Sequence, residues 1–439
     1  MAKKIALISL GCAKNLVNSE QMLYLLDEAG FETVPDPDGA DAAIVNTCGF
    51  IDSAKAEAID HILQLGHLKA QGRLGKLVVT GCLSQRYRRE ILEELPEIDA
   101  LVGVGSYDEI ADVLERTLAG EAVSRFGDKN RSVEETPRVV STGPGWAYLK
   151  IAEGCDNCCA FCAIPAIRGR YRSRPFEAIL EEAEALAAAG IGEIIVIAQD
   201  ITRYGTDNYG RPRLAELVRA LCGIPGVRWV RLHYLYPEAF DDDLIAAIAQ
   251  EPKVVKYLDI PIQHIDDAIL RRMNRRGDGA CIRQLFSRLR AEIPGLVIRT
   301  SLITGLPGEG EAEFEALCDF LAEHRLERVG VFPFSPEEGT PAAKMEDRCS
   351  PQEAEQRADR ILEFQAGVMD DWCQARVGET LTVLCEGWDP ESECHWGRSA
   401  FDSPDIDGRV LFRGGGEPGE FLEVEITGVL DGDLIGERQ

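Results

Sequence analysis

Short apolar runs alternate with helical stretches along most of this chain of 439 residues. Strands that alternate with helices build parallel sheets covered by helices, so the pattern predicts an α/β fold. In residues 1–118 it predicts an N-terminal parallel sheet domain. The predicted strands there are Ile5–Leu10, Ala42–Val45, Lys76–Val79 and Leu101–Val104, and the predicted helices are Ser19–Ala29, Ala54–Leu65, Tyr87–Leu95 and Tyr107–Leu118.

Residues 146–372 repeat the pattern in larger units, after a polar, Gly- and Pro-containing linker at 119–145. Six such units are too few for a closed eight-fold barrel and predict an open, partial (β/α)6 barrel, closed off by a long helix over Pro351–Arg376. The predicted strands are Ala147–Ile151, Glu193–Ala198, Val227–His233, Val255–Ile260, Leu296–Ile303 and Arg328–Phe334.

Residues 373–439 are short, β-rich and punctuated by Gly, which predicts a small antiparallel β-barrel of OB-like type. This segment holds 5 Arg and no Lys against 15 Asp and Glu, a net charge of −10. The whole chain carries −28. A barrel of this type that binds RNA is expected to be basic, so the charge favours a basic protein partner and argues against RNA as the main one.

The amino terminus offers no convincing secretory leader. The apolar run Ile5–Leu10 is six residues long, shorter than the usual h-region, and reads better as a strand. No apolar run reaches the length of a membrane helix. We therefore expect a cytoplasmic protein whose 14 Cys serve as metal ligands or reactive thiols and not as disulfides.

Three cysteines with the spacing C-x3-C-x2-C follow the first strand of the partial barrel. They are Cys155, Cys159 and Cys162. A [4Fe–4S] cluster normally takes four Cys, so three clustered Cys without a local fourth would leave one iron open to a small molecule. A structural zinc site and a chance grouping of buried thiols are the alternatives. Cys158 lies outside the spacing, and we interpret it as a spectator.

Three further cysteines each follow a predicted strand of the N-terminal domain and lie beside a Gly. They are Cys12, Cys48 and Cys82. Loops after neighbouring parallel strands meet at the carboxyl edge of the sheet, where ligands bind. These Cys are therefore predicted to hold a second Fe–S cluster, also with three protein ligands. Three unrelated buried Cys are the alternative.

The chain resembles the radical S-adenosylmethionine (SAM) methylthiotransferases nearly from end to end. The resemblance lies in the two cysteine sets and in four stretches: Ser9–Glu20 (SLGCAKNLVNSE), Ala198–Gly205 (AQDITRYG), Tyr257–His264 (YLDIPIQH) and Phe334–Pro341 (FSPEEGTP). Gln263-His264, where tRNA-modifying members carry Gln-Ser, favours the branch that modifies an aspartate of small-subunit ribosomal protein twelve. Ala13 and Asn18 replace the Pro and Asp that are common in relatives.

The resemblance implies a domain order of auxiliary-cluster domain, radical SAM core and TRAM barrel. It also implies that Cys12, Cys48 and Cys82 hold an auxiliary [4Fe–4S] cluster and that Cys155, Cys159 and Cys162 hold the SAM-binding one. In the family, one SAM donates a methyl group and another is cleaved to a radical that removes hydrogen from an unactivated carbon. No catalytic side chain beyond the cluster ligands is assigned.

Contacts to SAM are expected from Glu193, Arg299, Gly305, Pro307 and Gly308. The loop Gly305–Glu309 resembles the family's loop beside the SAM ribose, although a plain turn is the alternative. Glu193 would meet the SAM amino group or else be a solvated strand-initial charge. Arg299 would pair with the SAM carboxylate or else form a structural salt bridge. His264 is a candidate for positioning.

Two other functions compete with methylthiolation of a protein. A tRNA methylthiotransferase would share the chemistry but predicts a basic C-terminal barrel. A non-catalytic Fe–S carrier or zinc-bearing binding module does not explain six βα units. We expect a basic small-subunit ribosomal protein as substrate, a reductant protein such as flavodoxin or ferredoxin as electron source, no membrane, and a monomer.

Overall fold

The computed structural model describes residues 2–439, which divide into two compact units. The first unit contains residues 2–141, Ala152–Arg174 and Ser335–Ala343, and the second contains the remainder. Each unit is described here by itself. Within residues 2–439, none of the helices combines the length and apolarity that crossing a bilayer requires.

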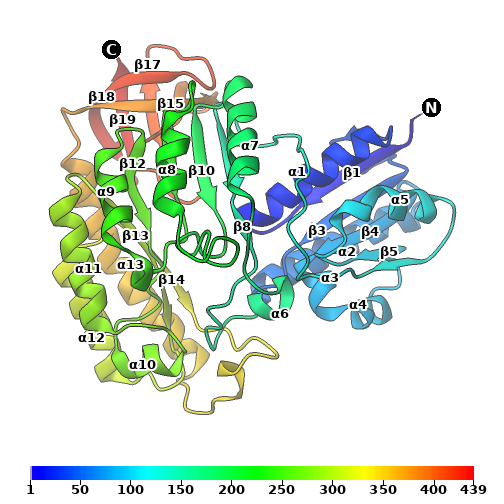
Figure 1. The fold of residues 1–439 in the computed structure, drawn as a ribbon, viewed down its shortest axis with the longest axis horizontal. Helices are drawn as coiled ribbons and strands as arrows, with labels where there is room; N and C mark the ends of the chain where they lie inside the picture. Colours follow the sequence, from blue (N-terminus) through cyan, green and yellow to red (C-terminus); the bar gives the residue numbers. More distant parts are fainter. Residues whose placement is uncertain (1) are drawn as a thin grey trace. The chain divides into compact units, whose positions relative to one another are not determined.

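The first unit is built on a six-stranded parallel sheet in the order β2-β1-β3-β4-β5-β6 (Figure 1). The parallel α/β fold predicted for the N-terminal region is confirmed. Two short strands, β2 and β6, were missed, and β6 lies in the segment that composition indicates as linker. The strands are β1 Lys4–Ser9, β2 Glu32–Val34, β3 Ala42–Thr47, β4 Lys76–Gly81, β5 Ala100–Val102 and β6 Val123–Arg125.

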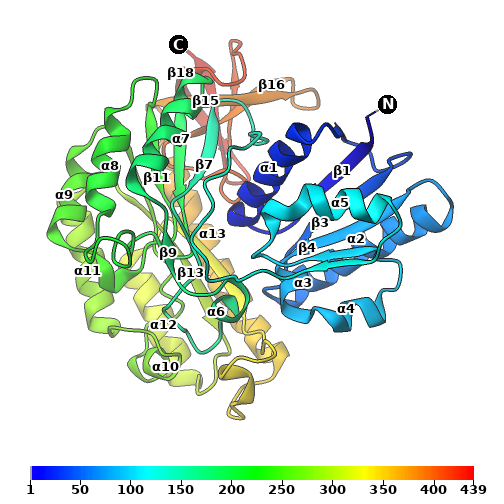
Figure 2. The same cartoon turned by 45° about the vertical axis from the view of Figure 1, so that its right-hand side comes forward.

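Helices cover both faces of this sheet, as the alternation of its side chains requires. Ile44 and Val78 pack with α1 and α5, whereas Val45 and Val79 pack with α2, α3 and α4 (Figure 2). Strands buried on both faces are typical of parallel sheets. The helices are α1 Ala13–Glu28, α2 Asp52–Ala70, α3 Cys82–Tyr87, α4 Arg89–Glu94 and α5 Ile110–Leu118, the last preceded by a 3-10 turn at Tyr107–Glu109.

The second unit contains an open six-stranded parallel sheet in the order β14-β13-β12-β11-β10-β7. All six strands predicted for the partial barrel are present. They are β7 Trp146–Lys150, β10 Glu193–Ile197, β11 Trp229–Leu232, β12 Val254–Asp259, β13 Val297–Thr304 and β14 Arg328–Pro333.

Helices connect these strands along the chain, and the long predicted helix packs against the last two strands (Figure 1). The connecting helices are α7 Phe176–Ala188, α8 Leu214–Gly223, α9 Asp242–Gln250, α10 Asp267–Arg272, α11 Gly279–Glu292 and α12 Glu311–His324. The long helix is α13 Pro351–Gln374, whose first turn is capped by Ser350.

A closed five-stranded barrel follows α13, in the order β15-β16-β17-β19-β18. Its core includes Val383, Phe412 and Val424. The predicted small β-barrel is confirmed, with one difference: β17 and β19 pair in parallel. The strands are β15 Thr380–Asp389, β16 Cys394–Ser399, β17 Val410–Arg413, β18 Phe421–Leu430 and β19 Asp433–Arg438.

Candidate functional site

Cys12, Cys48 and Cys82 lie at the carboxyl edge of the first unit's sheet, as the sequence predicts. Cys12 immediately precedes α1, Cys48 follows β3, and Cys82 opens α3 directly after β4. β3 pairs with both β1 and β4, so the three loops are neighbours. The helix after Cys12 begins six residues earlier than the predicted start at Ser19.

The glycines beside these cysteines allow the loops to pack closely. A Cβ on Gly11 would lie 2.7 Å from the Cβ of Cys48, and one on Gly49 would lie 2.7 Å from the backbone nitrogen of Leu83. Gly81 has φ of +98°, a conformation that favours glycine. The backbone therefore brings the residues next to Cys12, Cys48 and Cys82 together.

The three thiols differ in their tendency to ionise. Burial in the surrounding protein tends to raise the pKa of the Cys12 thiol. The cations Lys14 and Arg168, together with nearby backbone N–H groups, outweigh burial and lower this pKa. Burial, and then Cys82, raise the pKa of the Cys48 thiol to about 11. Burial also raises the pKa of Cys82 despite Arg168. Charge on Cys82 or Cys12 disfavours ionisation of Cys48, and charge on Cys12 disfavours ionisation of Cys82.

Cys155, Cys159 and Cys162 lie on one loop of the first unit, between β8 (Ala152–Glu153) and β9 (Arg172–Ser173). The antiparallel pair β8–β9 closes the base of this loop, and the N–H of Cys155 donates to the carbonyl of Gly169 at 3.1 Å. Cys155 and Cys159 are buried, whereas Cys158 is exposed with φ of +51°. The interpretation of Cys158 as a spectator stays a prediction.

The two cysteine sets meet through α6 (Ile164–Arg168), the short helix that follows Cys162. Cys82 packs against Ala163 and Ile167 in a small apolar cluster. Arg168, the last residue of α6, donates from Nε to the Sγ of Cys82 at 3.3 Å. The segment carrying one cysteine set thus contacts the other set directly.

Several buried polar atoms around Cys12, Cys48 and Cys82 have no hydrogen-bond partner among the described residues. They are Oδ1 of Asn46, Oγ1 of Thr80 and the hydroxyl of Tyr107. Asn46 and Thr80 lie at the ends of the strands that lead to Cys48 and Cys82. Buried polar groups are normally satisfied, so hydroxyl donors without acceptors beside three thiols fit a bound group with sulfur acceptors.

No group of three or more His, Cys, Asp or Glu side chains in residues 2–439 is arranged to hold a single metal ion. Each Cys of a four-iron cluster binds a different iron, so its ligands need not converge on one point. The thiol donors, the cationic Arg168 and the unsatisfied hydroxyls together fit a [4Fe–4S] cluster at Cys12, Cys48 and Cys82.

A third segment of the first unit holds both cysteine loops in place. Glu337, 2% exposed, accepts from Nζ of Lys55 at 2.9 Å and from Nη1 of Arg86 at 2.8 Å. Arg86 also donates to the carbonyl of Gly49, beside Cys48. The N–H of Ala342 donates to the carbonyl of Ala160, inside the C-x3-C-x2-C loop. Residues 335–343 therefore bind both sets of loops.

The expected SAM contact Glu193 is fully buried between two guanidinium groups in the second unit. Its Oε1 accepts from Nε of Arg231 at 2.7 Å, and its Oε2 accepts from Arg398 at 2.7 Å. Burial would raise the pKa of this carboxyl, but the two arginines outweigh it and lower the pKa. Glu193 also begins β10, at the edge opposite the loops that follow the strands. These contacts favour a structural role.

Arg299 lies within β13 and forms an ion pair with Asp259 of β12, with Nη1 3.1 Å from Oδ1. The side chain of Arg299 is 15% exposed. Burial opposes its charge, but Asp259 outweighs that and raises the pKa of the guanidinium. The salt-bridge interpretation therefore matches its position, and its guanidinium has a carboxylate partner before any ligand binds.

The loop after β13 contains Gly305, Pro307 and Gly308, the remaining expected SAM contacts. Gly305 has φ of +74°, and a Cβ there would lie 2.5 Å from the Cβ of Ala354. Oε1 of Glu309 accepts from the N–H of Gly305 at 2.9 Å and from Arg357 at 2.7 Å. A buried carboxylate thus fixes this loop at the carboxyl end of the strand, where ligands bind.

His264 belongs to the same cluster. Its Nδ1 accepts the N–H of Asp266 at 3.0 Å, so the proton of the neutral ring resides on Nε2. Nε2 points toward Oε2 of Glu309 at 3.4 Å. His264 therefore faces the Glu309 carboxylate, which fixes the Gly305–Gly308 loop. Its role in positioning stays a prediction.

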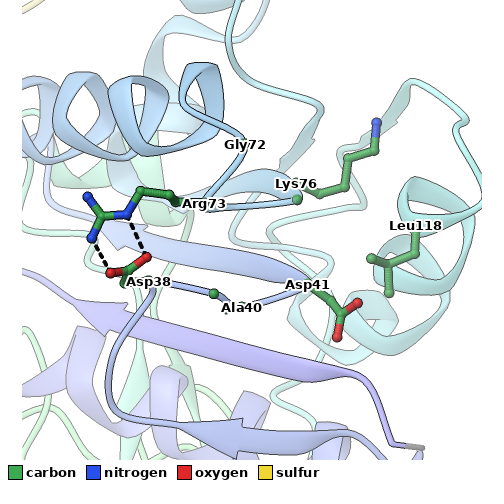
Figure 3. A pocket seen from close by; sticks show the side chains of 9 residues that line it. Asp38, Ala40, Asp41, Gly72, Arg73, Lys76 and Leu118 are labelled. Carbon is green, nitrogen blue, oxygen red and sulfur yellow. Dashed lines mark hydrogen bonds and ion pairs between the residues drawn. The ribbon is translucent and has the colours of Figure 1, made fainter.

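The first unit also has a hollow of about 480 Å³ at the opposite edge of its sheet (Figure 3). It is lined by loops that precede β3 and β4, and the ion pair between Arg73 and Asp38 lies at one end. Cys12, Cys48 and Cys82 follow the strands and so lie away from it. It is therefore separate from the candidate cluster site.

Sequence reasoning missed Arg168 and Tyr107, and it singled out the stretch Phe334–Pro341 without giving Glu337 a role. Arg168 and Glu337 each join segments that are far apart in the chain, Arg168 with Cys82 and Glu337 with Lys55. The signals available were the position of Arg168 in the same loop as Cys162 and that of Glu337 in the quoted stretch.

Three family descriptions match consecutive parts of the chain. Residues 4–103 match "Uncharacterized protein family UPF0004", residues 149–321 match the radical SAM superfamily, and residues 377–438 match the TRAM domain. These three regions contain all of the N-terminal sheet except β6, most of the partial barrel and the C-terminal barrel, respectively.

Curated relatives match over the full length. The protein of Acetivibrio thermocellus named "Ribosomal protein uS12 methylthiotransferase RimO" is 48% identical, covering 100% of this chain and 98% of the relative. The protein of Geobacter sulfurreducens with the same name is 47% identical, covering 99% and 98%. The protein of Lachnoclostridium phytofermentans, also so named, is 47% identical, covering 99% of both.

Among solved structures, the radical SAM methyltransferase TsrM of Kitasatospora setae, solved with cobalamin and a [4Fe–4S] cluster, has a TM-score of 0.57. It is 15% identical and covers 78% of this chain and 74% of its own, which shows a shared fold. The full-length relatives, at 47–48% identity, are more similar to this chain than TsrM is. Together with the radical SAM and TRAM regions, they show that this chain belongs to the RimO family of radical SAM methylthiotransferases.

Proposed function

We propose that this chain adds a methylthio group to the β-carbon of an aspartate in the small-subunit ribosomal protein uS12. Family membership supplies the reaction class. The structural observation that carries the proposal is the contact between the two cysteine sets, where Arg168 of the helix after Cys162 meets Cys82. A reaction that joins SAM cleavage to sulfur transfer needs two metal centres served by neighbouring segments.

Two [4Fe–4S] clusters and SAM are the proposed cofactors. Cys12, Cys48 and Cys82 would hold the auxiliary cluster, and Cys155, Cys159 and Cys162 would hold the SAM-binding one. When bound, these groups supply the one-electron chemistry that an unactivated C–H bond requires and that no side chain can provide. Three ligands per set leave one iron of each cluster open.

The chain's own residues position the cofactors and shield them from water. Gly305, Pro307 and Gly308 form the proposed SAM-facing loop, which Glu309, Arg357 and His264 hold in shape. Arg299 and Glu193 are weaker candidates for SAM contact because carboxylate or guanidinium partners already occupy them. Residues 335–343 bind next to the cysteine loops through the ion pairs of Glu337 with Lys55 and Arg86.

The proposed division of labour follows the predicted domains. Residues 1–118 serve the auxiliary cluster, residues 146–372 serve SAM, and residues 373–439 receive the substrate, with 119–145 as connection. The C-terminal barrel has a net charge of −10, which attracts a basic protein and repels a phosphate backbone. A reductant such as flavodoxin or ferredoxin, a cytoplasmic location and a monomeric state complete the proposal.

Anaerobic reconstitution followed by mass spectrometry tests this function. The full chain, with iron, sulfide, SAM and a reductant, is incubated with a uS12 peptide that contains the target aspartate, and separately with tRNA. One methylthio group should appear on the peptide's aspartate. It should be lost in Cys159→Ala and in Cys48→Ala, and retained in Cys158→Ala, the exposed neighbour in the same loop.

The competing outcomes are separable. A methylthio group on tRNA alone would overturn the substrate assignment and would show that the acidic barrel does not exclude RNA. SAM cleavage that persists in Cys159→Ala would overturn the assignment of the SAM-binding cluster. Iron content unchanged by Cys12→Ala, Cys48→Ala and Cys82→Ala together would overturn the auxiliary cluster.

A further inference from the structure

Arg168 is a fully enclosed cation whose partners come from several segments of the first unit. It is 2% exposed. Besides Cys82 at 3.3 Å, it donates to Oδ1 of Asn18 at 2.8 Å and to Oδ1 of Asn15 at 3.0 Å. A buried guanidinium is costly to desolvate, so its retention beside a thiol calls for a compensating negative charge.

One carboxylate, Glu153, pairs with one side of the Arg168 guanidinium and supplies negative charge there, but the Nε side has a sulfur as its partner. Oε2 of Glu153 is 3.2 Å from Nη1 of Arg168, whereas Nε points at the sulfur of Cys82. Asn15 and Asn18 are neutral acceptors that fix the plane of the guanidinium without balancing its charge. Nε is therefore directed at the place where a thiolate-bound cluster would carry negative charge.

Tyr107 adds a second donor in the same surroundings. Its hydroxyl is buried and has no hydrogen-bond partner among residues 2–439. The 3-10 turn that Tyr107 opens packs against α1, the helix that begins directly after Cys12. Burial raises the pKa of the Tyr107 hydroxyl, and the charges of Arg168 and Cys82 also act on it.

We propose that Arg168, assisted by Tyr107, sets the reduction potential of the cluster bound by Cys12, Cys48 and Cys82, and that Glu153 opposes it. This inference rests on the proposed function, which places a cluster on those three cysteines. Arg168 acts through charge and through its hydrogen bond to a ligand sulfur, and is a positioning residue, since it does not itself ligate iron.

The direction of the effect follows from electrostatics. A thiolate-bound cluster becomes more negative on reduction, and a buried cation beside it stabilises the reduced form. Hydrogen bonds to cluster or ligand sulfurs act in the same direction. Removing Arg168 should therefore make the potential more negative. Removing the Glu153 carboxylate leaves the guanidinium less screened and should make the potential more positive.

The test is a potentiometric titration followed by electron paramagnetic resonance (EPR). It uses the full chain with Cys155, Cys159 and Cys162 replaced by Ala, so that only the auxiliary cluster remains. We expect Arg168→Gln to lower the midpoint potential, Arg168→Lys to restore part of it, and Tyr107→Phe to lower it by less. Glu153→Gln should raise it. General structural damage would not shift the midpoint potentials of Arg168→Gln and Glu153→Gln in opposite directions.

Arg328→Gln is the matched control, because Arg328 is also buried and ion-paired but contacts Asp402 in the second unit. Its midpoint should equal that of the parent. An unchanged potential in Arg168→Gln and in Glu153→Gln, with iron content and EPR signal intact, would overturn the inference while leaving the cluster assignment in place. If Arg168→Gln cannot hold iron, the sign of the Glu153→Gln shift decides. Absence of the signal from the parent would overturn the proposed function instead.

Discussion

Two glutamate–arginine pairs on neighbouring turns show how burial decides what a charge contributes. Glu309 is fully buried and pairs with Arg357 of α13. Glu315, on α12, pairs with Arg360, one turn further along α13, but both side chains are about half exposed. Solvent and salt screen the exposed pair, whereas the buried carboxylate also fixes the loop at Gly305.

Glu309→Gln should therefore destabilise the loop after β13 by about 1–3 kcal/mol, because the buried Arg357 guanidinium loses its negatively charged partner. Hydrogen exchange of residues 300–310 measures this, and the KM for SAM should rise more than kcat falls. Glu315→Gln is the control and should change neither quantity. Equal exchange in the two variants would show that the Glu309 carboxylate does not hold the loop.

Asp99 predicts an acid-dependent contribution to stability. Burial alone would raise the pKa of its carboxyl, but Lys69, the N–H of Leu77 and Lys76 outweigh it and hold the pKa below its usual range. Because the folded-state pKa lies below the unfolded value of about 3.9, this contribution is complete above that pH. It is lost as the pH falls through the folded-state pKa.

The thermal midpoint of the wild type should therefore exceed that of Asp99→Asn at about pH 6, and the difference should shrink as the pH approaches about 3. Asp27→Asn, at an exposed position of α1, serves as the control and should track the wild type. If the difference in thermal midpoint grew as the pH fell, the pKa of Asp99 would have to be raised in the folded protein, contrary to this prediction.

At the scale of elements, the strands with long apolar runs were predictable and the short edge strands were not. β13 and β14 appear in the sequence as continuous runs that match the observed bounds within about a residue. β2 (Glu32–Val34) and β6 (Val123–Arg125) are three residues long, at the sheet edges, and two of the three side chains in each are polar. Their pairing depends on the neighbouring strand, which no local pattern reveals.

The start of α1 was missed for a related reason. Lys14, Asn15 and Asn18 look like loop residues, yet all three are buried. Asn15 and Asn18 accept from Arg168, which lies about 150 residues away in the chain. The cysteine ligands themselves were predictable from spacing and strand context, whereas the residues that hold them together depend on long-range packing.

One side chain, Glu337, attaches residues 335–343 to the helices α2 and α3. Glu337→Gln removes the negative charge that pairs with both Lys55 and Arg86, and should weaken the attachment of this segment by about 1–3 kcal/mol. Exchange of residues 335–343 should accelerate, and so should that of the first turns of α2 and α3. Glu338→Gln is the matched control, because Glu338 is exposed and only its carbonyl meets Arg86.

If the amides of residues 335–343 exchange at the same rate in Glu337→Gln and in Glu338→Gln, the ion pairs of Glu337 do not attach the segment. In that case the backbone bond from Ala342 to Ala160 would be the remaining attachment to test.

At the scale of the second unit, buried polar contacts tie the C-terminal barrel to the six-stranded sheet. Glu193 binds Arg398, Arg328 binds Asp402, and the hydroxyl of Tyr257 donates to Asp407 at 2.6 Å. The loop between β16 and β17 supplies both aspartates. Because each contact is buried, the barrel and the sheet should open together and not as independent modules.

Glu193→Gln tests that coupling and the role of Glu193 at once. Arg231 would lose its carboxylate partner and Arg398 would keep only Glu386, which should cost about 3–5 kcal/mol, and exchange should rise in β10 and β16 together. The affinity for SAM should change little. A loss of SAM binding with unchanged exchange would instead support the contact expected from sequence.

The attachment of residues 335–343 to the cysteine loops has a consequence for how the protein is made. The sheet that carries Cys12, Cys48 and Cys82 leaves the ribosome first, but the segment that binds its loops belongs to residues 335–343. At about 5–20 residues per second, roughly 10–50 s separate the synthesis of Cys82 from that of Glu337. During translation the loops that carry the thiols therefore lack this attachment, and the order of synthesis sets an interval in which a cluster can be loaded before the segment binds them.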